Sequence, residues 1–224
     1  MRKGKTVLLS LVLALFILSF SIAVPILVRP FYYAHITGLK LPEQTGLTFE
    51  EIRTAYDEMM DFCLGLRKDF STGILVWSES GKAHFEDCRS LFLLDLSVLA
   101  VTAVILAFLV LWRLRARTDR APAGLIAGRS FLFWGPVGLL AVGIVTAGLA
   151  ALDFDRAFVV FHHLFFPGKT NWTFDPLQDS IICVLPQVFF RNAAICILAV
   201  LVILCAVCIA LDARERRLKR EEKN

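Results

Sequence analysis

Four long apolar stretches decide what this chain can fold into. They cover residues 6–28, 91–112, 130–152 and 192–211, and Asp95 is the one charged residue inside them. About 20 apolar residues in a helix cross a hydrocarbon core of roughly 30 Å. Lipid offers no partner to open backbone groups, so each stretch must be helical. The sequence therefore predicts an all-α membrane protein with four transmembrane helices, forming one integral domain over residues 1–224.

The first stretch has an alternative interpretation as a cleaved signal peptide. Basic residues precede it, and Ser21 and Ala23 resemble the small residues of a cleavage site. The apolar run is longer than that of a typical signal peptide, which favours a first transmembrane helix.

Basic residues at the ends of the spans predict the orientation. Fourteen Lys and Arg residues lie in residues 1–5, in the connector 113–129 and in the tail 212–224. Short loops rich in Lys and Arg stay in the cytoplasm, so both termini are expected there. Within the connector, Ala121-Pro122-Ala123-Gly124 is typical of a turn. The net charge of +4 is thus explained by membrane anchoring, and no nucleic-acid partner is expected.

The outer segment 29–90 predicts a small extracytoplasmic domain between the first two spans. Thr48 and Glu51 have the spacing of a capping box at the start of a helix. Apolar side chains then recur at helical spacing, at Phe49, Ile52, Tyr56, Met59, Cys63 and Leu66. This face either forms the domain's core or lies on the outer leaflet of the membrane.

The outer segment 153–191 lies between the last two spans and is rich in aromatic residues. Its final part, residues 181–190, is apolar, broken by Pro186 and too short to cross a bilayer. We expect a re-entrant or interfacial loop there.

The sequence allows the cysteines on the outer side to be either free thiols or partners in a disulfide. Cys63, Cys88 and Cys183 are expected outside, where disulfides can form, and a bridge between Cys63 and Cys88 is one possibility. A catalytic thiolate has less support, since no cysteine lies in an activating sequence.

All four histidines fall on the predicted outer side, and histidine is the side chain that exchanges protons near neutral pH. A helix beginning near residue 83 would put His84, Asp87 and Asp95 on one face, where Asp87 could orient the His84 ring. An ionisable group inside the membrane is usually functional, although the carboxylate of Asp95 could instead extend to the interface.

The pair His162-His163 also has more than one interpretation. The two rings could simply pack beside phenylalanines at the interface. Alternatively, His84, His162 and Asp175 could bind zinc, although none of the usual zinc-site spacings is present.

Several motifs together resemble one family of Gram-positive membrane proteins, the lipoprotein intramolecular transacylases. The family pattern has Phe-His-x-x-Phe-Phe, a Trp, [Asp/Asn]-Pro-x-x-Asp and Pro-x-x-Phe-Phe, preceded by a Ser-Glu-rich stretch with His and, three residues later, Asp. The matching positions here are Ser78, Glu79, His84, Asp87, Phe161, His162, Phe165, Phe166, Trp172, Asp175, Pro176, Asp179, Pro186, Phe189 and Phe190. Cys88 departs from the pattern, in which an aliphatic residue is expected.

The resemblance implies an acyltransferase of the bacterial cell membrane. Such an enzyme moves the sn-2 acyl chain of a diacylglyceryl lipoprotein to the α-amino group of its N-terminal cysteine, giving a lyso-form lipoprotein. It points to His84 and His162 as the catalytic residues, and no acyl-enzyme, cofactor or metal is expected. We expect His84, oriented by Asp87, to be the base for the amine and His162 to be the acid or the oxyanion stabiliser, although the two roles could be exchanged. Supporting roles are expected for Asp87, Asp95, Trp172, Asp175 and Asp179, and acyl-chain or loop packing for Phe161, Phe165, Phe166, Phe189 and Phe190.

The expected partners are the diacylated lipoprotein substrate and membrane lipid, and the sequence does not indicate an oligomeric state. The alternatives are a non-catalytic membrane protein that binds lipid or a partner, and a metal-dependent membrane hydrolase. A transporter is disfavoured because the chain has no internal repeat and only one carboxylate within its spans.

Overall fold

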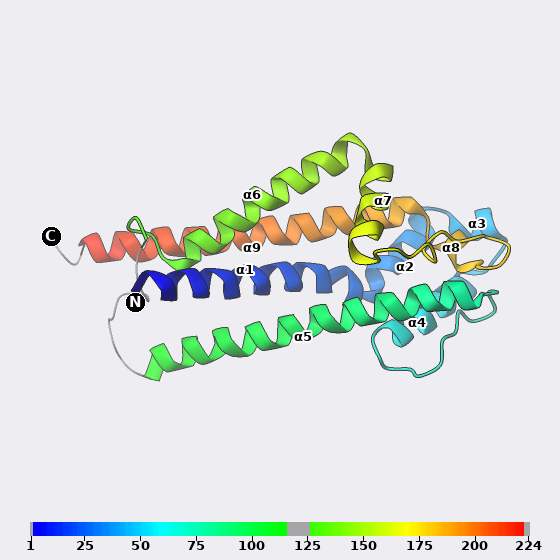
Figure 1. Cartoon of the computed structure of the whole chain (residues 1–224), viewed down its shortest axis with the longest axis horizontal. Coiled ribbons are helices and arrows are strands. Elements are labelled where there is room, and N and C mark those ends of the chain that lie inside the picture. The colour runs from blue at the N-terminus through cyan, green and yellow to red at the C-terminus, as the bar shows by residue number, and fades with distance from the viewer. Residues whose placement is uncertain (1, 116–125, 222–224) are drawn as a thin grey trace. The chain divides into compact units, whose positions relative to one another are not determined.

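The computed structural model describes residues 2–115 and 126–221, and most of these residues are helical (Figure 1). The helices are α1 (Arg2–Leu27), α2 (Arg29–Gly38), α3 (Leu41–Thr45), α4 (Phe49–Cys63), α5 (Glu79–Arg115), α6 (Phe131–Leu152), α7 (Phe154–Phe165), α8 (Ile181–Val184) and α9 (Gln187–Glu221). The turn expected at residues 121–124 lies outside the described residues.

Four of these helices, α1, α5, α6 and α9, are long and apolar enough to cross a membrane. This confirms the predicted all-α fold with four spans, and the chain is a multi-pass membrane protein. Two of the helices are longer than their apolar stretches, because α5 has 37 residues and α9 has 35. Apolar residues are needed only where a helix meets lipid, so hydropathy marks the crossing part and not the helix ends.

The chain divides into two compact units. The first comprises Met1–Ile22, Leu96–Gly148 and Ile197–Asn224. Its core contains Leu13, Ile17, Phe131, Leu201 and Cys205, with leucines from α5 and α6 packed around it. At Gly135 of α6, an added Cβ would lie 2.6 Å from the backbone oxygen of Ser10 in α1. Only glycine allows these two backbones to approach so closely.

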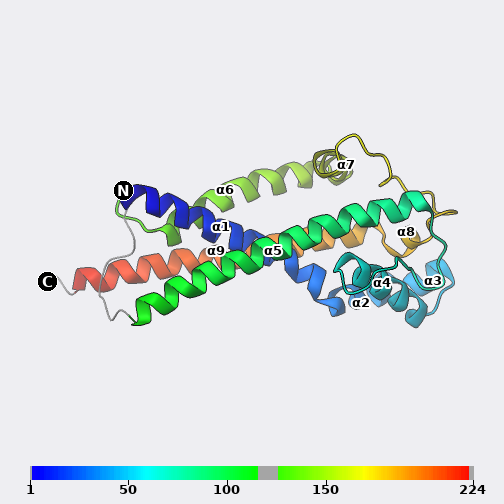
Figure 2. The ribbon, with the colours of Figure 1, turned by 60° about the horizontal axis from the view of Figure 1, so that its bottom comes forward.

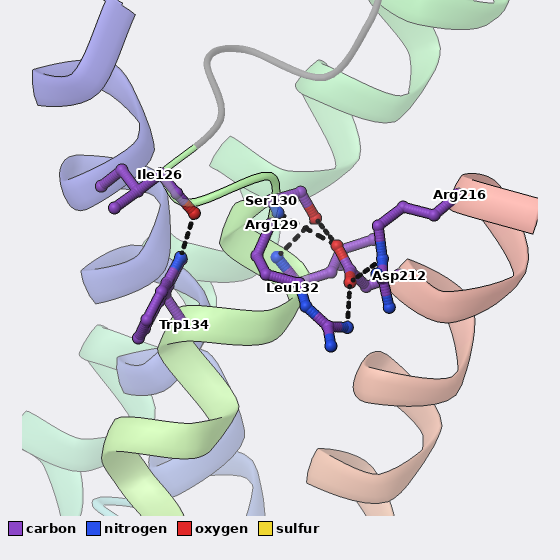
Figure 3. A network of polar contacts seen from close by, with 7 residues as sticks. All are labelled: Ile126, Arg129, Ser130, Leu132, Trp134, Asp212 and Arg216. Atoms are coloured by element: carbon purple, nitrogen blue, oxygen red, sulfur yellow. Dashed lines mark hydrogen bonds and ion pairs between the residues drawn. The ribbon is translucent and has the colours of Figure 1, made fainter. Parts of the chain in front are cut away.

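A buried carboxylate joins α6 to α9 within this first unit (Figure 3). Asp212 is 1% exposed, and its Oδ1 accepts hydrogen bonds from the backbone N–H of Ser130 at 3.0 Å and the Ser130 hydroxyl at 2.7 Å. Its Oδ2 is 3.2 Å from Arg129 and 3.0 Å from Arg216. A buried charge must be paired and hydrogen-bonded, and Asp212 meets both conditions. It also holds Ser130, whose hydroxyl accepts from the backbone N–H of Leu132 at the start of α6.

We expect Asp212→Asn to lower the stability of the protein in detergent by about 1–2 kcal/mol, or roughly 2–8 °C in melting temperature. The amide keeps an acceptor for Ser130 but loses the charge that both arginines face. Thermal unfolding would measure the difference, and Glu221→Gln at an exposed position of α9 is the matched control. Equal melting temperatures for the Asp212 and Glu221 variants would contradict this role.

The second unit comprises Ala23–Asp95 and Leu149–Cys196. Within it, α2, α3, α4 and α8 lie side by side (Figures 1 and 2). The capping box at Thr48 and Glu51 is confirmed, with both reciprocal hydrogen bonds present. The apolar face of α4 is buried in protein, so it forms a core and does not lie open on the membrane. Leu66 does not belong to that face, because α4 ends at Cys63 and Leu66 is 75% exposed.

Two stacked tyrosines form the centre of this core. The rings of Tyr32 and Tyr56 lie 3.7 Å apart, and the hydroxyl of Tyr32 donates to the carbonyl of Val184 in α8 at 2.7 Å. Burial raises the pKa of Tyr32, so its hydroxyl keeps the proton that it donates. The Tyr32–Val184 hydrogen bond ties α2 to the segment that leads into α9.

Cys63 and Cys88 are separate thiols in the structure, so the bridge considered from the sequence is not formed. Cys63 is buried in α4, and burial raises its pKa to about 12. A thiol held neutral in this way is not a nucleophile at physiological pH.

Candidate active site

Two imidazole rings from distant parts of the chain meet within the second unit. His84 lies in the second turn of α5 and His162 in the last turn of α7. The ring centroids are 5.7 Å apart with an angle of 33° between the planes, and each residue is 6% exposed. The structure thus brings together the two histidines that the resemblance selected.

Helix α7 carries His162, and the sequence encodes the start of this helix locally. Asp153 is its N-cap, and its carboxylate accepts a hydrogen bond from the backbone N–H of Arg156 at 2.9 Å. Phe154–Phe165 then forms three turns, in which Phe158 lies one turn before His162. The outer loop expected from residue 153 onward therefore begins with a helix, which the apolar pattern alone did not reveal.

The protonation of His162 follows from one hydrogen bond. Its Nδ1 lies 2.7 Å from the carbonyl oxygen of Phe158. A carbonyl only accepts, so Nδ1 must carry the proton. In the neutral ring, Nε2 therefore has the free lone pair, which is the property that a general base needs.

Burial lowers the pKa of His162 below its ordinary value of 6.5; the hydrogen bond to Phe158 opposes this shift, and nearby His163 adds to it. We therefore expect an NMR titration of His162 to have its midpoint below 6.5, so that the ring is neutral at physiological pH. The folded protein binds this proton less tightly than the unfolded protein does. The free energy of unfolding therefore decreases as the pH falls below about 6.5, the pKa of an exposed histidine. A midpoint above 6.5 would contradict this assignment.

Aromatic rings surround His84. Its ring centroid lies 5.0 Å from that of Phe166 and 5.4 Å from that of Phe174, both with edge-to-face geometry. Its Nε2 lies 3.4 Å from the sulfur of Cys88, one turn further along α5. Among the described residues, Nδ1 of His84 has no hydrogen-bond partner although it is buried.

Asp87 does not orient the His84 ring as we expected from the sequence. Its two carboxylate oxygens bind Lys169 and Asn171, the latter at 3.1 Å, and both of these residues lie in the loop after α7. Helical spacing placed Asp87 near His84, but it could not show which loop would supply opposite charge. Asp87 instead fastens that loop to α5.

Asp179 fastens the same loop to the start of α5. It is 5% exposed, and its two oxygens accept hydrogen bonds from the backbone N–H and the hydroxyl of Ser78, both at 2.8 Å. The Ser78 hydroxyl in turn accepts from the backbone N–H of Gly81 at 3.0 Å, as an N-cap does. The end of α5 that carries His84 is therefore fixed by a carboxylate 101 residues away in the sequence.

The other three residues expected to have supporting roles, Trp172, Asp175 and Asp95, lie at different distances from the histidine pair. Trp172 stacks on His162 with 4.6 Å between centroids, and its indole N–H donates to the carbonyl of Lys169. Asp175 is exposed and accepts hydrogen bonds within its own turn, from the backbone of Leu177 and the side chain of Gln178. Asp95 lies 11 residues after His84 on α5, which is about 16 Å of helix rise.

The zinc interpretation has no support from this arrangement. Asp175 uses its oxygens in a local turn. Within residues 2–115 and 126–221, no three His, Cys, Asp or Glu side chains are grouped so that they could hold a metal ion.

The five phenylalanines expected to pack around acyl chains or loops lie in three places. Phe166 is 4% exposed and contacts both catalytic candidates, with ring centroids 5.0 Å from His84 and 5.7 Å from His162. Phe189 packs on the tyrosine pair, and Phe190 packs on Phe158. Phe161 and Phe165 pack on one another and are each 47% exposed.

The remaining histidines differ from this pair. His35 donates from Nδ1 to the carbonyl of Phe31 at 2.7 Å and accepts at Nε2 from Asn192 at 3.0 Å, so both of its nitrogens are occupied. His163 is exposed on α7 and lies edge-on to Trp172.

Sequence reasoning missed four residues at the site: Cys88, Lys169, Asn171 and Phe174. The position of Cys88 one turn after His84 was visible in the sequence, and a thiol at that spacing could have been paired with the ring. Lys169, Asn171 and Phe174 lie in a loop, and loops have no periodic sequence pattern from which the direction of a side chain can be predicted.

Comparisons with known proteins agree on one family. Residues 7–190 match the sequence profile described as "Lipoprotein intramolecular transacylase Lit". The solved structure of the membrane-integral lipoprotein intramolecular transacylase Lit from Bacillus cereus is similar, with a TM-score of 0.86 and 25% identity over 99% of this chain and 98% of that one.

Two further structures of the Bacillus cereus protein carry a histidine replaced by arginine or by alanine. Each has a TM-score of 0.79, at 24% and 25% identity, and each match covers 99% of this chain and at least 95% of the other. Comparison with curated protein sequences gave no match.

Proposed function

Because this chain belongs to the lipoprotein intramolecular transacylase family, and is therefore an acyltransferase, we propose that it moves the sn-2 acyl chain of a diacylglyceryl lipoprotein to the α-amino group of the N-terminal cysteine. The observation that carries the proposal is the pair of buried imidazoles, 5.7 Å apart, from α5 and α7. The product is a lyso-form lipoprotein with one ester-linked and one amide-linked chain.

The reaction needs no outside reactant. The amine nitrogen attacks the sn-2 carbonyl carbon, a C–N bond forms, and the bond from that carbon to the glyceryl oxygen breaks. One proton leaves the nitrogen and one arrives on the glyceryl oxygen, so atoms and charge balance. An amide is more stable than an ester, which supplies the driving force. Since both groups belong to one molecule, holding them in contact supplies much of the acceleration, up to roughly 7–11 kcal/mol in favourable cases.

The two histidines then carry the proton and the developing charge. His162 has its lone pair on Nε2, because Nδ1 is committed to the carbonyl of Phe158, and it takes the proton from the amine. It returns that proton to the glyceryl oxygen. His84 faces the carbonyl oxygen and stabilises the oxyanion by a hydrogen bond. A covalent acyl-enzyme is not required.

The substrate reaches this site from the outer leaflet of the membrane. The flanking basic residues favour cytoplasmic termini, which puts α7 and both imidazoles on the extracytoplasmic side. The exposed rings of Phe161 and Phe165 on α7 offer apolar contacts for acyl chains of lipid and substrate. Membrane lipid and the lipoprotein are therefore the proposed partners.

The test is direct. Purified protein is incubated with a synthetic diacylated lipopeptide, and the product is analysed by fragment-ion mass spectrometry. We expect an unchanged total mass with one acyl chain relocated to nitrogen. A lipopeptide that remains unchanged under conditions where the protein is folded would refute an enzymatic role, and loss of one acyl chain to water would indicate a hydrolase.

A further inference from the structure

The thiol of Cys88 is within hydrogen-bond distance of His84, and this contact has no place in the mechanism above. Its sulfur lies 3.4 Å from Nε2 of the ring, one helical turn away on α5. Both residues face the same side of the helix, since positions four apart are neighbours. The contact therefore follows from the regular helix and does not need a flexible loop.

The opposite nitrogen of the ring is buried and unsatisfied. His84 is 6% exposed, and among the described residues its Nδ1 has no hydrogen-bond partner. Buried polar atoms are nearly always paired, and an exception at a catalytic site needs an explanation. An N–H that donates only to the oxyanion formed during the reaction has no hydrogen-bond partner before substrate binds.

We infer that Cys88 is a positioning residue: its S–H donates to Nε2 of His84 and thereby holds the ring as the neutral tautomer with the proton on Nδ1. An imidazole nitrogen is a good acceptor and sulfur a weak one, so the thiol proton points toward nitrogen. Fixing the proton at the far nitrogen makes His84 a hydrogen-bond donor toward the reacting carbonyl. The catalytic part of this inference rests on the proposed acyl transfer.

The two histidines would then be complementary. The carbonyl of Phe158 holds the proton of His162 on Nδ1 and leaves Nε2 as an acceptor. Cys88 does the reverse for His84, leaving Nδ1–H as a donor. One ring removes a proton while the other stabilises negative charge, and each tautomer is set by a neighbour one turn away on the same helix.

NMR of protein labelled with ¹⁵N-histidine reads the tautomer without any substrate. The His84 signals are assigned by their loss in His84→Gln, and spectra are compared for wild type, Cys88→Ala, Cys88→Ser and the control Cys183→Ala, an exposed thiol in α8. We expect a protonated Nδ1 in wild type and in the control, a mixture of tautomers in Cys88→Ala, and recovery in Cys88→Ser. A protonated Nε2 in wild type, or an unchanged tautomer in Cys88→Ala, would overturn the inference.

Kinetics with the diacylated lipopeptide measure the consequence. We expect Cys88→Ala to lower kcat roughly five- to tenfold with KM little changed, which is the effect of losing one modest hydrogen bond. Cys88→Ser should recover most of this loss, and Cys183→Ala should match wild type. Equal kcat in wild type and Cys88→Ala would refute the inference that Cys88 contributes to catalysis through His84. Inactive wild-type protein would refute the proposed function, whereas the tautomer is decided by the spectra alone.

Discussion

Replacing either His84 or His162 with alanine is expected to lower acyl transfer by about 10²–10⁴-fold, the usual contribution of a positioned acid or base. The two rings lie 5.7 Å apart and are nearly buried, so solvent cannot easily take over the missing role. The measurement is the rate at which a synthetic diacylated lipopeptide becomes the lyso-form, followed by mass spectrometry.

His163→Ala is the matched control, because it removes the same side chain from the next position of α7. His163 is exposed and lies only edge-on to Trp172, so its loss should leave the rate within about twofold of wild type. Thermal unfolding of all three variants in detergent shows whether each remains folded. Rates like wild type in both His84→Ala and His162→Ala would end the histidine mechanism.

The second large effect is expected at Gly81. An added Cβ at this position would lie 2.1 Å from Oδ1 of Asp179 and 2.7 Å from its Cγ, so the two side chains cannot coexist. Asp179 is buried and holds Ser78 with both oxygens, so it cannot move aside without breaking the cap of α5. We expect Gly81→Ala to destabilise the protein by up to about 3 kcal/mol and to reduce activity more than tenfold, by displacing the turn that carries His84.

Gly148→Ala in α6 is the control, since an added Cβ there meets no atom within 4 Å. Alanine favours helices over glycine, so this control should be neutral or slightly stabilising. The double variant Gly81→Ala with Asp179→Ala distinguishes the clash from a general helix effect. If the clash is the cause, the double variant is no less stable than Asp179→Ala alone. Additive losses would show that Gly81 matters for another reason.

Local rules predicted several particular features well. Four long apolar stretches required four helices, since lipid leaves the backbone no alternative. The Thr48–Glu51 capping box forms because both of its partners lie within four residues in the chain. In both cases the interaction is local in sequence or is imposed by the solvent. The resemblance to a family pattern of aromatic, proline and acidic residues selected His84 and His162, whose catalytic role stays a prediction.

The partner of Asp87 could not be predicted in this way. Helical spacing suggested His84, whereas the structure gives Lys169 and Asn171, more than 80 residues away in the sequence. The same holds for Asp179 and Ser78, which join a loop to the start of a helix across 101 residues. Such contacts depend on the path of the whole chain, which periodicity and composition do not specify.

The sequence by itself determined the membrane solvent and the number of spans, because both depend on hydropathy, and its resemblance to a family pattern selected the two histidines as candidates. Only the tertiary structure decided that the two rings meet, that Phe158 and Cys88 contact their nitrogens, and that Asp179 fixes the end of α5. The physical reason is that proton positions and close contacts are set by atoms within a few ångströms, and folding brings these together from segments far apart in the chain.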